Sequence, residues 1–396
     1  MSRFLEALHA AGTPREPAGA LDRWYCGAVA TAILALPSGY SGYVMAALLA
    51  LVVVDVATGR FRWVPVSFGR AAAALVAAAL ASGLASAWRW PSTGLAVLFG
   101  LMLLVTIYPT ARVLGGRPEV VRWWTGIWVV GGALAAGWGI ARAVLHWPNG
   151  ASTPALGENA LGTNLIAVIA LALGGWTVWS APRVRGALAA TLILLVIALE
   201  LTWSRAAWGA AIIAAAVAIA LAPRQKAALI ALSVVSVAVA TWTVGAGRQI
   251  LEYHLGTLTL EANYDRVAIW KAAFKMWRDH PVLGTGYGSF ATVWPQYEPD
   301  PALYGKPTAH NLVLNFAAET GTVGLAAFLA VVGSGLSGLW SRVRSSRGDP
   351  SSDGLWTGLF AATVGVLAQQ IFDGTVMSWH VGYGLILLFT LGGIRG

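Results

Sequence analysis

Charged residues and cysteines are scarce in this chain of 396 residues. Asp, Glu, Lys and Arg together make up 11% of it, whereas 57% of the residues are hydrophobic. Soluble domains usually contain about 25% charged and about 45–50% apolar residues, so the composition excludes an ordinary soluble protein. The single cysteine, Cys26, also excludes a disulfide within the chain and a cysteine-based metal site.

A dense basic cluster is missing as well, although the formal net charge is +9. The Lys and Arg residues are spread singly and in pairs between apolar segments. This distribution suits contact with anionic membrane lipids and argues against a nucleic-acid groove. Residues 1–22 lack the short apolar core and small-residue cleavage site of a signal peptide. We therefore expect the first apolar segment to be a permanent helix.

Long apolar segments dominate what remains. A hydrocarbon core of roughly 30 Å requires about 20 apolar residues per crossing helix. The sequence predicts an all-α integral membrane protein with about twelve transmembrane helices. The candidate spans lie near residues 24–38, 41–57, 71–88, 92–109, 120–141, 160–180, 186–203, 206–222, 226–244, 309–334, 355–373 and 376–393.

The positions of the basic residues predict the orientation of these spans. If the chain starts in the cytoplasm, most Lys and Arg residues fall in cytoplasmic segments, and the short outer loops contain only Arg89, Arg142 and Arg205. Short cytoplasmic loops are enriched in Lys and Arg. Both termini are therefore predicted to be cytoplasmic. Reading the first two segments as one kinked helix is the alternative, and it would invert every later loop.

One connection is much longer than the others. We divide the chain into an N-terminal segment, 1–22, nine transmembrane helices in 23–244, a large outer loop in 245–308, and three more helices in 309–396. Loops longer than about 12–15 residues are usually functional or disordered. This division predicts a separate outer subdomain between the ninth and tenth helices.

The outer loop contains an amphipathic helical pattern. Val267, Trp270, Phe274 and Trp277 recur at a spacing of three to four residues, which is typical of a helix lying in a membrane interface. The following His-Pro pair predicts its end. The glycines at 284, 286 and 288 then predict tight turns. A lipid-surface helix without any chemistry is the simpler reading of this pattern.

Three residues at the outer boundary are candidate site residues, because ionisable groups are costly there. Arg205 follows the seventh span, Arg266 opens the amphipathic helix, and His310 opens the tenth span. Each has a simpler explanation: a lipid-phosphate anchor, a surface ion pair and an ordinary helix start, respectively. Together, two guanidinium groups and an imidazole suit an anionic phosphate leaving group and a hydroxyl that must lose its proton.

Three motifs resemble those of the O-antigen ligase and polymerase superfamily of bacterial envelope glycosyltransferases. They are LTWSRAAW at 201–208, DRVAIWKAAFKMWRDHPVLGTGYGSF at 265–290 and HNLVLNFAAETGTVGL at 310–325. A weaker element, GTNLIA at 162–167, has Thr163 where the family usually has proline. The resemblance covers about residues 160–330.

The resemblance implies an inverting, metal-independent glycosyl transfer without a cofactor, on the periplasmic side of the bacterial inner membrane. The donor would be a glycan on undecaprenyl diphosphate, and in the ligase branch the acceptor would be a sugar hydroxyl of lipid A-core. Carried onto this chain, Arg205 and Arg266 would bind the diphosphate, and His310 would activate the acceptor hydroxyl. Membrane lipids would be the other contacts, and no nucleic acid is implied.

Further residues are possible secondary contributors to substrate binding: Asn311, Glu319, Asn164, Trp270 and Tyr287. On a straight helix Glu319 would lie on roughly the opposite face from His310, so the two are not expected to form a dyad. Asp373, near the outer end of the eleventh span, is expected to be structural. No Asp-rich metal motif occurs in the outer loops, and no metal site is expected.

Two other functions remain open at this point. A polymerase of the same superfamily would use the same donor but a second lipid-linked glycan as acceptor. A twelve-helix transporter or flippase would use the long loop as a gate. A single long outer loop favours the ligase, since polymerases of this type often contain two.

Overall fold

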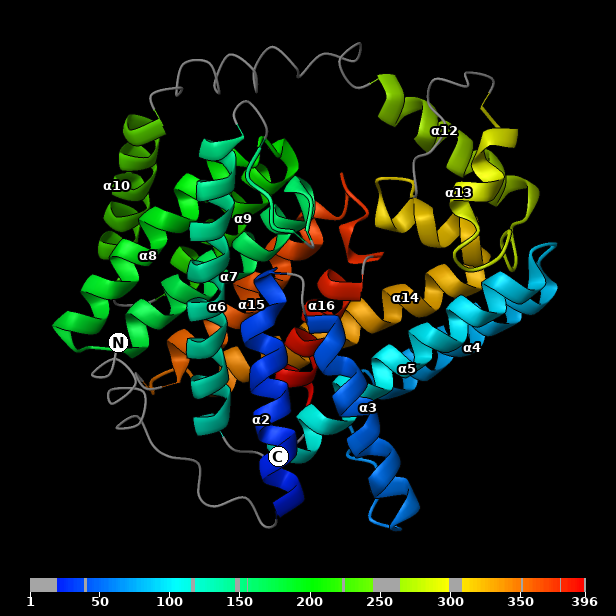
Figure 1. The fold of residues 1–396 in the computed structure, drawn as a ribbon, viewed down its shortest axis with the longest axis horizontal. Coiled ribbons are helices and arrows are strands. Elements are labelled where there is room, and N and C mark those ends of the chain that lie inside the picture. The colour runs from blue at the N-terminus through cyan, green and yellow to red at the C-terminus, as the bar shows by residue number, and fades with distance from the viewer. Residues whose placement is uncertain are drawn as a thin grey trace.

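Each predicted apolar segment contains a helix in the computed structural model (Figure 1). The structure describes residues 20–38, 41–114, 118–146, 150–154, 156–222, 225–244, 264–298, 308–349, 352–377 and 379–394. The helices are α2 (Ala20–Ala35), α3 (Ser41–Ala57), α4 (Gly69–Ala85), α5 (Arg89–Leu114), α6 (Pro118–Leu145), α7 (Glu158–Val178), α8 (Pro182–Leu201), α9 (Arg205–Leu221), α10 (Lys226–Val244), α14 (Leu312–Ser345), α15 (Asp353–Gln369) and α16 (Trp379–Gly393).

The predicted helical membrane class is confirmed by these elements. Among the described residues the β-structure amounts to one isolated bridge, between Val66 and Ile394. Five helices are long and apolar enough to cross a membrane: Arg89–Leu114, Glu119–Leu145, Glu158–Val178, Pro182–Leu201 and Leu312–Ser345. The number of crossings, the side of each loop and the cytoplasmic position of the termini remain predictions.

Helix α7 lies at the centre of the fold. Every residue from Leu161 to Gly175 is buried, as expected for a helix that is apolar on all sides. It packs most extensively against α15, where Gly174 comes so close to Gly354 and Gly358 that a Cβ atom would clash with the opposite backbone. Small residues allow such close contact between membrane helices. The pair α7–α15 therefore forms a rigid axis for the surrounding helices.

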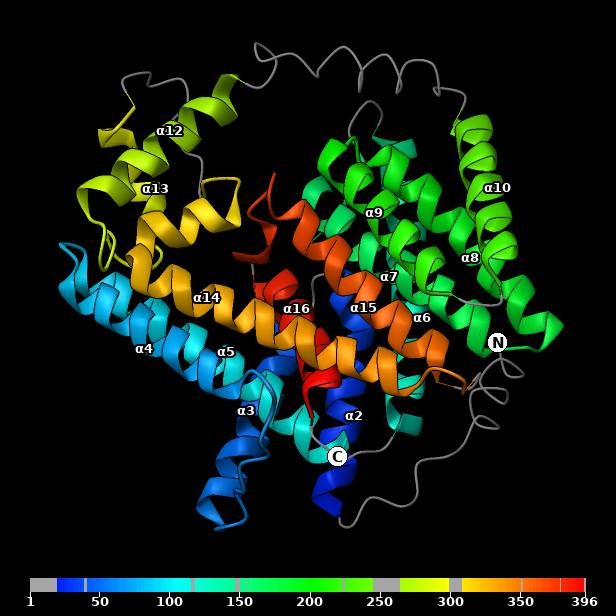
Figure 2. The ribbon, with the colours of Figure 1, turned by 180° about the vertical axis from the view of Figure 1, so that it is seen from behind.

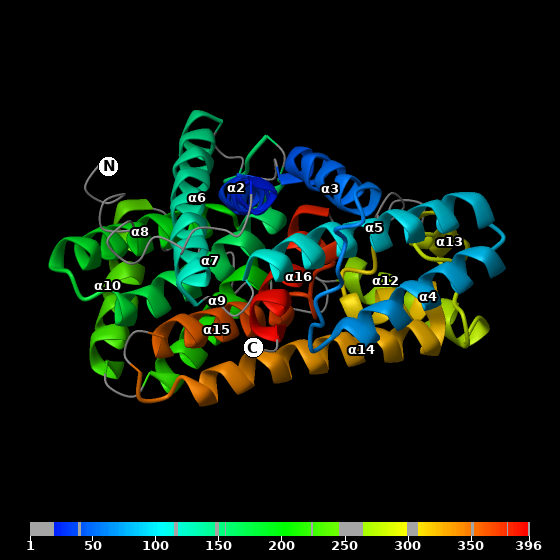
Figure 3. The same ribbon diagram turned by 90° about the horizontal axis from the view of Figure 1, so that it is seen from below.

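A second group of helices lies beside this axis. Helices α4 and α5 form a hairpin, and α14 runs along α4 (Figures 1 and 2). Seen from below, α14 extends along one edge, between α15 at one end and α4 at the other (Figure 3). This arrangement leaves a space between the α4–α5 hairpin, α14 and α16.

Helix α14 is not straight, which corrects the single span predicted for 309–334. Gly321 has φ 64° and ψ −165°, a conformation that glycine adopts at little cost. Phe316 and Phe328 stack with ring centroids 4.3 Å apart, although twelve residues of a straight helix would separate them by about 18 Å. The helix therefore consists of a short arm, 312–320, that turns back at Gly321 onto a long arm, 322–345.

The loop after α12 (Tyr264–Asp279) fills the corner of α14. The amides of Thr285 and Gly286 donate to the carbonyls of Ala318 and Glu319 at 3.0 and 2.9 Å. On the other side, Ser86 Oγ of the α4–α5 hairpin donates to the Thr285 carbonyl at 2.6 Å. Positive φ values at Gly284, Gly286 and Gly288 confirm the predicted tight turns. Two short helices follow, α13 (Phe290–Val293) and a 3-10 turn at Trp294–Gln296.

The amphipathic helix of the outer loop is confirmed, but its protein-facing side differs from the predicted apolar stripe. Ala268, Ile269, Ala272, Ala273 and Met276 are buried, and α12 packs against α14. Phe274 of the predicted stripe is half-exposed and contacts Trp277 with tilted rings, whose centroids are 5.5 Å apart. The rest of the predicted loop subdomain, residues 245–263 and 299–307, lies outside the described residues.

Candidate active site

The start of α14 is fixed to the turn that follows α15. Asn311 caps α14, because its side-chain oxygen accepts from the Leu314 amide at 3.0 Å, while its Nδ2 donates to the Ile371 carbonyl at 2.9 Å. The Leu312 amide also donates to the Gln370 carbonyl, at 2.8 Å. His310 has φ 49°, which is uncommon for a residue with a side chain. These contacts hold the His310 backbone next to residues 370–373.

This arrangement brings His310 together with Asp373. The distance from His310 Nδ1 to Asp373 Oδ1 is 3.3 Å, and the two side chains are 21% and 4% exposed. The same carboxylate oxygen accepts from the Gly374 amide at 2.8 Å, which fixes its position. A carboxylate at Nδ1 favours the tautomer with the proton on that nitrogen, and leaves Nε2 free to accept a proton. Orientation of a base by an acidic neighbour is a common feature of catalytic sites.

The His310–Asp373 contact was not predicted, because Asp373 was expected to be structural. The two residues are 63 positions apart, and no spacing rule connects them. One signal was available: Asp373 is an ionisable residue at the outer boundary of a span, and such residues are functional candidates by default.

Glu319 holds the glycine-rich loop against the short arm of α14. Its two carboxylate oxygens accept from the amides of Gly288 and Phe290, both at 3.0 Å. Tyr287 lies within this loop and stacks near Phe99 of α5, with ring centroids 5.3 Å apart. Burial raises the pKa of the Tyr287 hydroxyl, and the Glu319 carboxylate raises it further. The hydroxyl therefore stays protonated at neutral pH and can donate a hydrogen bond.

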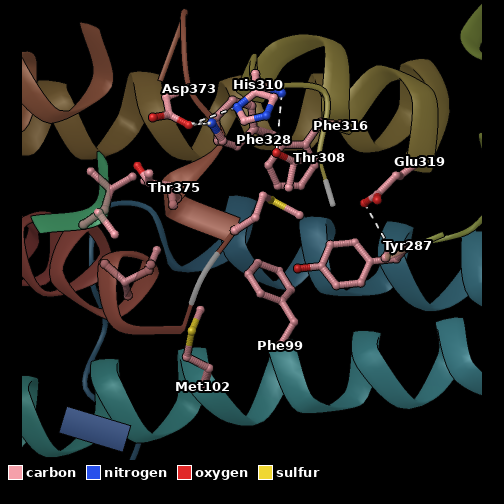
Figure 4. Close-up of a pocket in the computed structure, with 18 of the residues that line it drawn as sticks. Phe99, Met102, Tyr287, Thr308, His310, Phe316, Glu319, Phe328, Asp373 and Thr375 are labelled. Atoms are coloured by element: carbon pink, nitrogen blue, oxygen red, sulfur yellow. Dashed lines mark hydrogen bonds and ion pairs between the residues drawn. The ribbon is translucent and has the colours of Figure 1, made fainter. Parts of the chain in front are cut away.

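His310, Asp373, Glu319 and Tyr287 line one cavity of about 620 Å³ (Figure 4). Its polar part also includes Glu158, Asn159, Thr308 and Thr375. The remaining wall is apolar and is formed mainly by Leu75, Leu95, Phe99, Met102, Phe316, Phe328, Val331, Leu385, Ile386 and Phe389. The cavity thus combines several polar side chains, including the imidazole of His310, with an extensive apolar wall. The turn in α14 creates part of this wall, because it places Phe316 beside Phe328.

Arg205 and Arg266 are not among the described residues that line this cavity. Arg205 is the first residue of α9, directly after the capping residue Ser204. Arg266 lies in the first turn of α12, where its amide donates to Asp265 Oδ1 at 2.9 Å. Both side chains are partly buried. The predicted gathering of these guanidinium groups around His310 therefore stays a prediction.

Indirect contacts nevertheless connect the three elements through the turn after α15. Trp270, one turn beyond Arg266, packs against Phe372 with ring centroids 6.4 Å apart. On the other side, Thr163 Oγ1 of α7 lies 2.9 Å from Thr375 Oγ1. The neighbouring Gly162 lies close to Ala207, in the first turn of α9 after Arg205. Residues 370–375 thus touch the short arm of α14, α12 and α7, and α7 in turn touches α9.

The contacts of two secondary candidates, Asn164 and Trp270, lie within the protein, and their proposed roles in substrate binding stay predictions. Asn164 is buried in α7, and its Nδ2 donates to the Ala160 carbonyl of its own helix at 3.0 Å. Its neighbour Thr163, at the position where the family usually has proline, contacts the cavity-lining Thr375 instead. Trp270 contacts Phe372, next to Asp373. Within the described part of the chain, no three His, Cys, Asp or Glu side chains form a group that could hold a metal ion.

Comparison with known protein families connects this geometry to an activity. Residues 190–329 match the family model described as O-antigen ligase. The matched segment contains Arg205, Arg266, His310 and Glu319, while Asp373 lies beyond it. No curated protein matches the chain. Residues 190–329 are thus similar to the O-antigen ligase family, and the resemblance predicted from the sequence is confirmed over this segment.

Proposed function

We propose that the protein is an O-antigen ligase, which transfers a glycan from undecaprenyl diphosphate to a sugar hydroxyl of lipid A-core. One observation carries this proposal: an imidazole held by a buried carboxylate lines a cavity with both polar and apolar walls, and the histidine lies in the segment that matches the O-antigen ligase model. A hydroxyl-activating base next to an apolar chamber is what transfer between two lipid-linked glycans requires.

His310 would act as the general base. As the acceptor oxygen attacks the anomeric carbon of the donor sugar, Nε2 takes the hydroxyl proton, and the bond from that carbon to the diphosphate oxygen breaks. The electron pair leaves with the diphosphate, and the attack from the opposite side inverts the anomeric centre. Asp373 would orient the ring and stabilise the imidazolium that forms.

Arg205 and Arg266 would stabilise the leaving group. A diphosphate gains negative charge as the glycosidic bond breaks, and preorganised guanidinium groups in a water-poor site favour this change. In this proposal the two arginines replace a metal ion. Binding of the donor would draw α12 and the start of α9 toward the His310 side of the cavity, since both elements are already connected to the turn at residues 370–375.

The remaining cavity residues would bind the substrates. The protonated Tyr287 hydroxyl and the Thr308 hydroxyl would contact sugar hydroxyl groups in the cavity. The apolar wall of the cavity would bind hydrocarbon chain of the lipid-linked substrate. We place the protein in the bacterial inner membrane with this cavity facing the periplasm, because this orientation puts most basic loops in the cytoplasm.

The activity can be tested in a ligase-deficient strain. Arg205→Ala, Arg266→Ala and His310→Ala should each abolish attachment of glycan to lipid A-core. Arg278→Ala is the matched control, because Arg278 lies on the same helix as Arg266 and is exposed. Normal attachment by all three variants, at normal protein level, would show that the assignment is wrong.

The acceptor can be tested with purified protein. We expect glycan transfer only when lipid A-core is added to the undecaprenyl-linked donor. If donor chains grow longer without lipid A-core, the protein is a polymerase of the same superfamily.

A further inference from the structure

A second cavity lies at the opposite end of the central axis. The active-site cavity is lined by residues at the start of α7 and just after the end of α15, whereas this one is lined by Thr177 at the end of α7 and Asp353 at the start of α15. Its volume is about 440 Å³. The His310 chemistry does not use it.

Two cations lie in its wall. Lys226 starts α10, and Arg347 follows the end of α14. Both side chains are exposed, so they can reach a ligand without rearrangement of the fold. Asp353 is the acidic residue of the same wall, which leaves a net charge of about +1 and suits a ligand with one negative charge.

The cavity also contains an unsatisfied polar atom. Thr357 lines it and is only 3% exposed. Its Oγ1 has no hydrogen-bond partner among the described residues. A buried hydroxyl without a partner is unfavourable, and a phosphate oxygen or headgroup hydroxyl would satisfy it.

An apolar groove adjoins this cavity. The groove has a volume of about 540 Å³, lies between α7, α8, α9 and α10, and shares Leu173 of α7 with the basic cavity. Large apolar side chains remain exposed along it, including Ile212, Val234 and Val237. An apolar groove of this volume next to a basic pocket offers room for a hydrocarbon chain beside a headgroup.

We propose that this composite site binds a single glycerophospholipid with one phosphodiester charge. The phosphate would lie between Lys226 and Arg347, and an acyl chain would fill the groove between α9 and α10. Basic pockets between membrane helices are known to bind phospholipid headgroups. The lipid would hold α10 against α9 at the end of the molecule away from the reaction.

Native mass spectrometry of the detergent-purified protein with added phosphatidylglycerol tests this site. Lys226→Gln/Arg347→Gln should weaken retention of one lipid by about tenfold, because two charge-assisted contacts are lost. Arg183→Gln/Arg344→Gln is the matched control: both arginines are exposed and neither lines the cavity. Equal loss in the two double variants, or no loss in the first, would overturn the proposal.

Two further experiments distinguish the contribution of the headgroup to binding from that of the acyl chain. Val234→Trp should fill the groove and weaken phosphatidylglycerol binding while the basic pocket stays intact. Glycerol phosphate alone should bind at least tenfold more weakly than the whole lipid, and equal binding would contradict a role for the groove. Because every readout is lipid binding, failure of this proposal leaves the transferase assignment untouched, and the reverse is also true.

Discussion

At the scale of single residues, the contact between His310 and Asp373 is the feature with the clearest chemical consequence. The carboxylate is nearly inaccessible to solvent and is fixed by the Gly374 amide. Its value to the proposed reaction is orientation of the imidazole, because its Oδ1 contacts His310 Nδ1.

Replacing Asp373 by asparagine should therefore reduce turnover more than binding. The amide can donate to Nδ1 and favour the wrong tautomer, so we expect kcat to fall by about 10- to 100-fold with little change in KM for the donor. Steady-state kinetics over a range of pH would measure this. Asp373→Glu should recover part of the lost turnover and restore the shape of the pH profile. A parallel loss of folded protein in both variants would instead mean a structural role.

The two arginines can be tested for the geometry of their contact with phosphate. Arg205→Lys and Arg266→Lys keep the charge but remove the planar, two-pronged donor set, so transfer should drop by about tenfold or more. The matched control is Arg278→Lys on the exposed side of α12, which should leave glycan transfer unchanged. Full activity of the site variants would mean that charge alone is sufficient.

At the scale of elements, the turn inside α14 is the feature that spacing along a straight helix does not predict. The chain turns back at Gly321, so Phe328 and Val331 of the long arm line the same cavity as His310 and Glu319, which precede the turn. An uninterrupted apolar helix pattern contains no signal for this turn except the glycine itself, and many glycines in membrane helices lie in regular helix.

A pair of glycine substitutions on α14 tests the turn. Gly321→Ala should lower the free energy of unfolding by about 1–3 kcal/mol, because its φ and ψ suit only glycine, and a Cβ would meet the backbone of Val282. Gly333→Ala lies on the same helix in open space and should be neutral or stabilising by up to about 1 kcal/mol. Thermal unfolding in detergent gives the comparison. Similar behaviour of both variants would contradict the turn.

For α12 the sequence predicted the helix correctly, but it did not predict which side of the helix packs against the protein. The spacing of Val267, Trp270, Phe274 and Trp277 correctly indicated a helix. Its packing side consists largely of alanines, which carry little hydrophobic signal but allow close approach to α14. The large aromatic residues predicted a different apolar side, on which Phe274 is half-exposed.

At the scale of the whole molecule, the order and approximate positions of the helices could be predicted because hydropathy records them directly. The three motif residues Arg205, Arg266 and His310 could be selected from charge at the membrane boundary. The contact of His310 with Asp373 and the pairing of Thr163 with Thr375 could not be predicted, because they depend on how α7, α14 and α15 pack. Packing contacts between distant segments leave no periodic trace in one sequence.

The predicted orientation is accessible to cysteine labelling, since the chain has one cysteine. In a Cys26→Ala background, Asp279→Cys at the end of α12 should react with a membrane-impermeant maleimide added to spheroplasts. Ser345→Cys at the end of α14 should react only after the membrane is permeabilised. Both positions are exposed in the fold. The reverse pattern would place the His310 cavity on the cytoplasmic side.

The fold of α14 also decides how deep in the bilayer the reaction would take place. As a straight rod its 34 residues would measure about 51 Å, roughly 20 Å more than the hydrocarbon thickness, and the histidine would stand far out in the aqueous phase. If the long arm crosses the membrane in the predicted orientation, the folded short arm would bring the imidazole back toward the level of the lipid phosphates. A pyrophosphate anchored by its own long tail would meet the base without leaving the membrane.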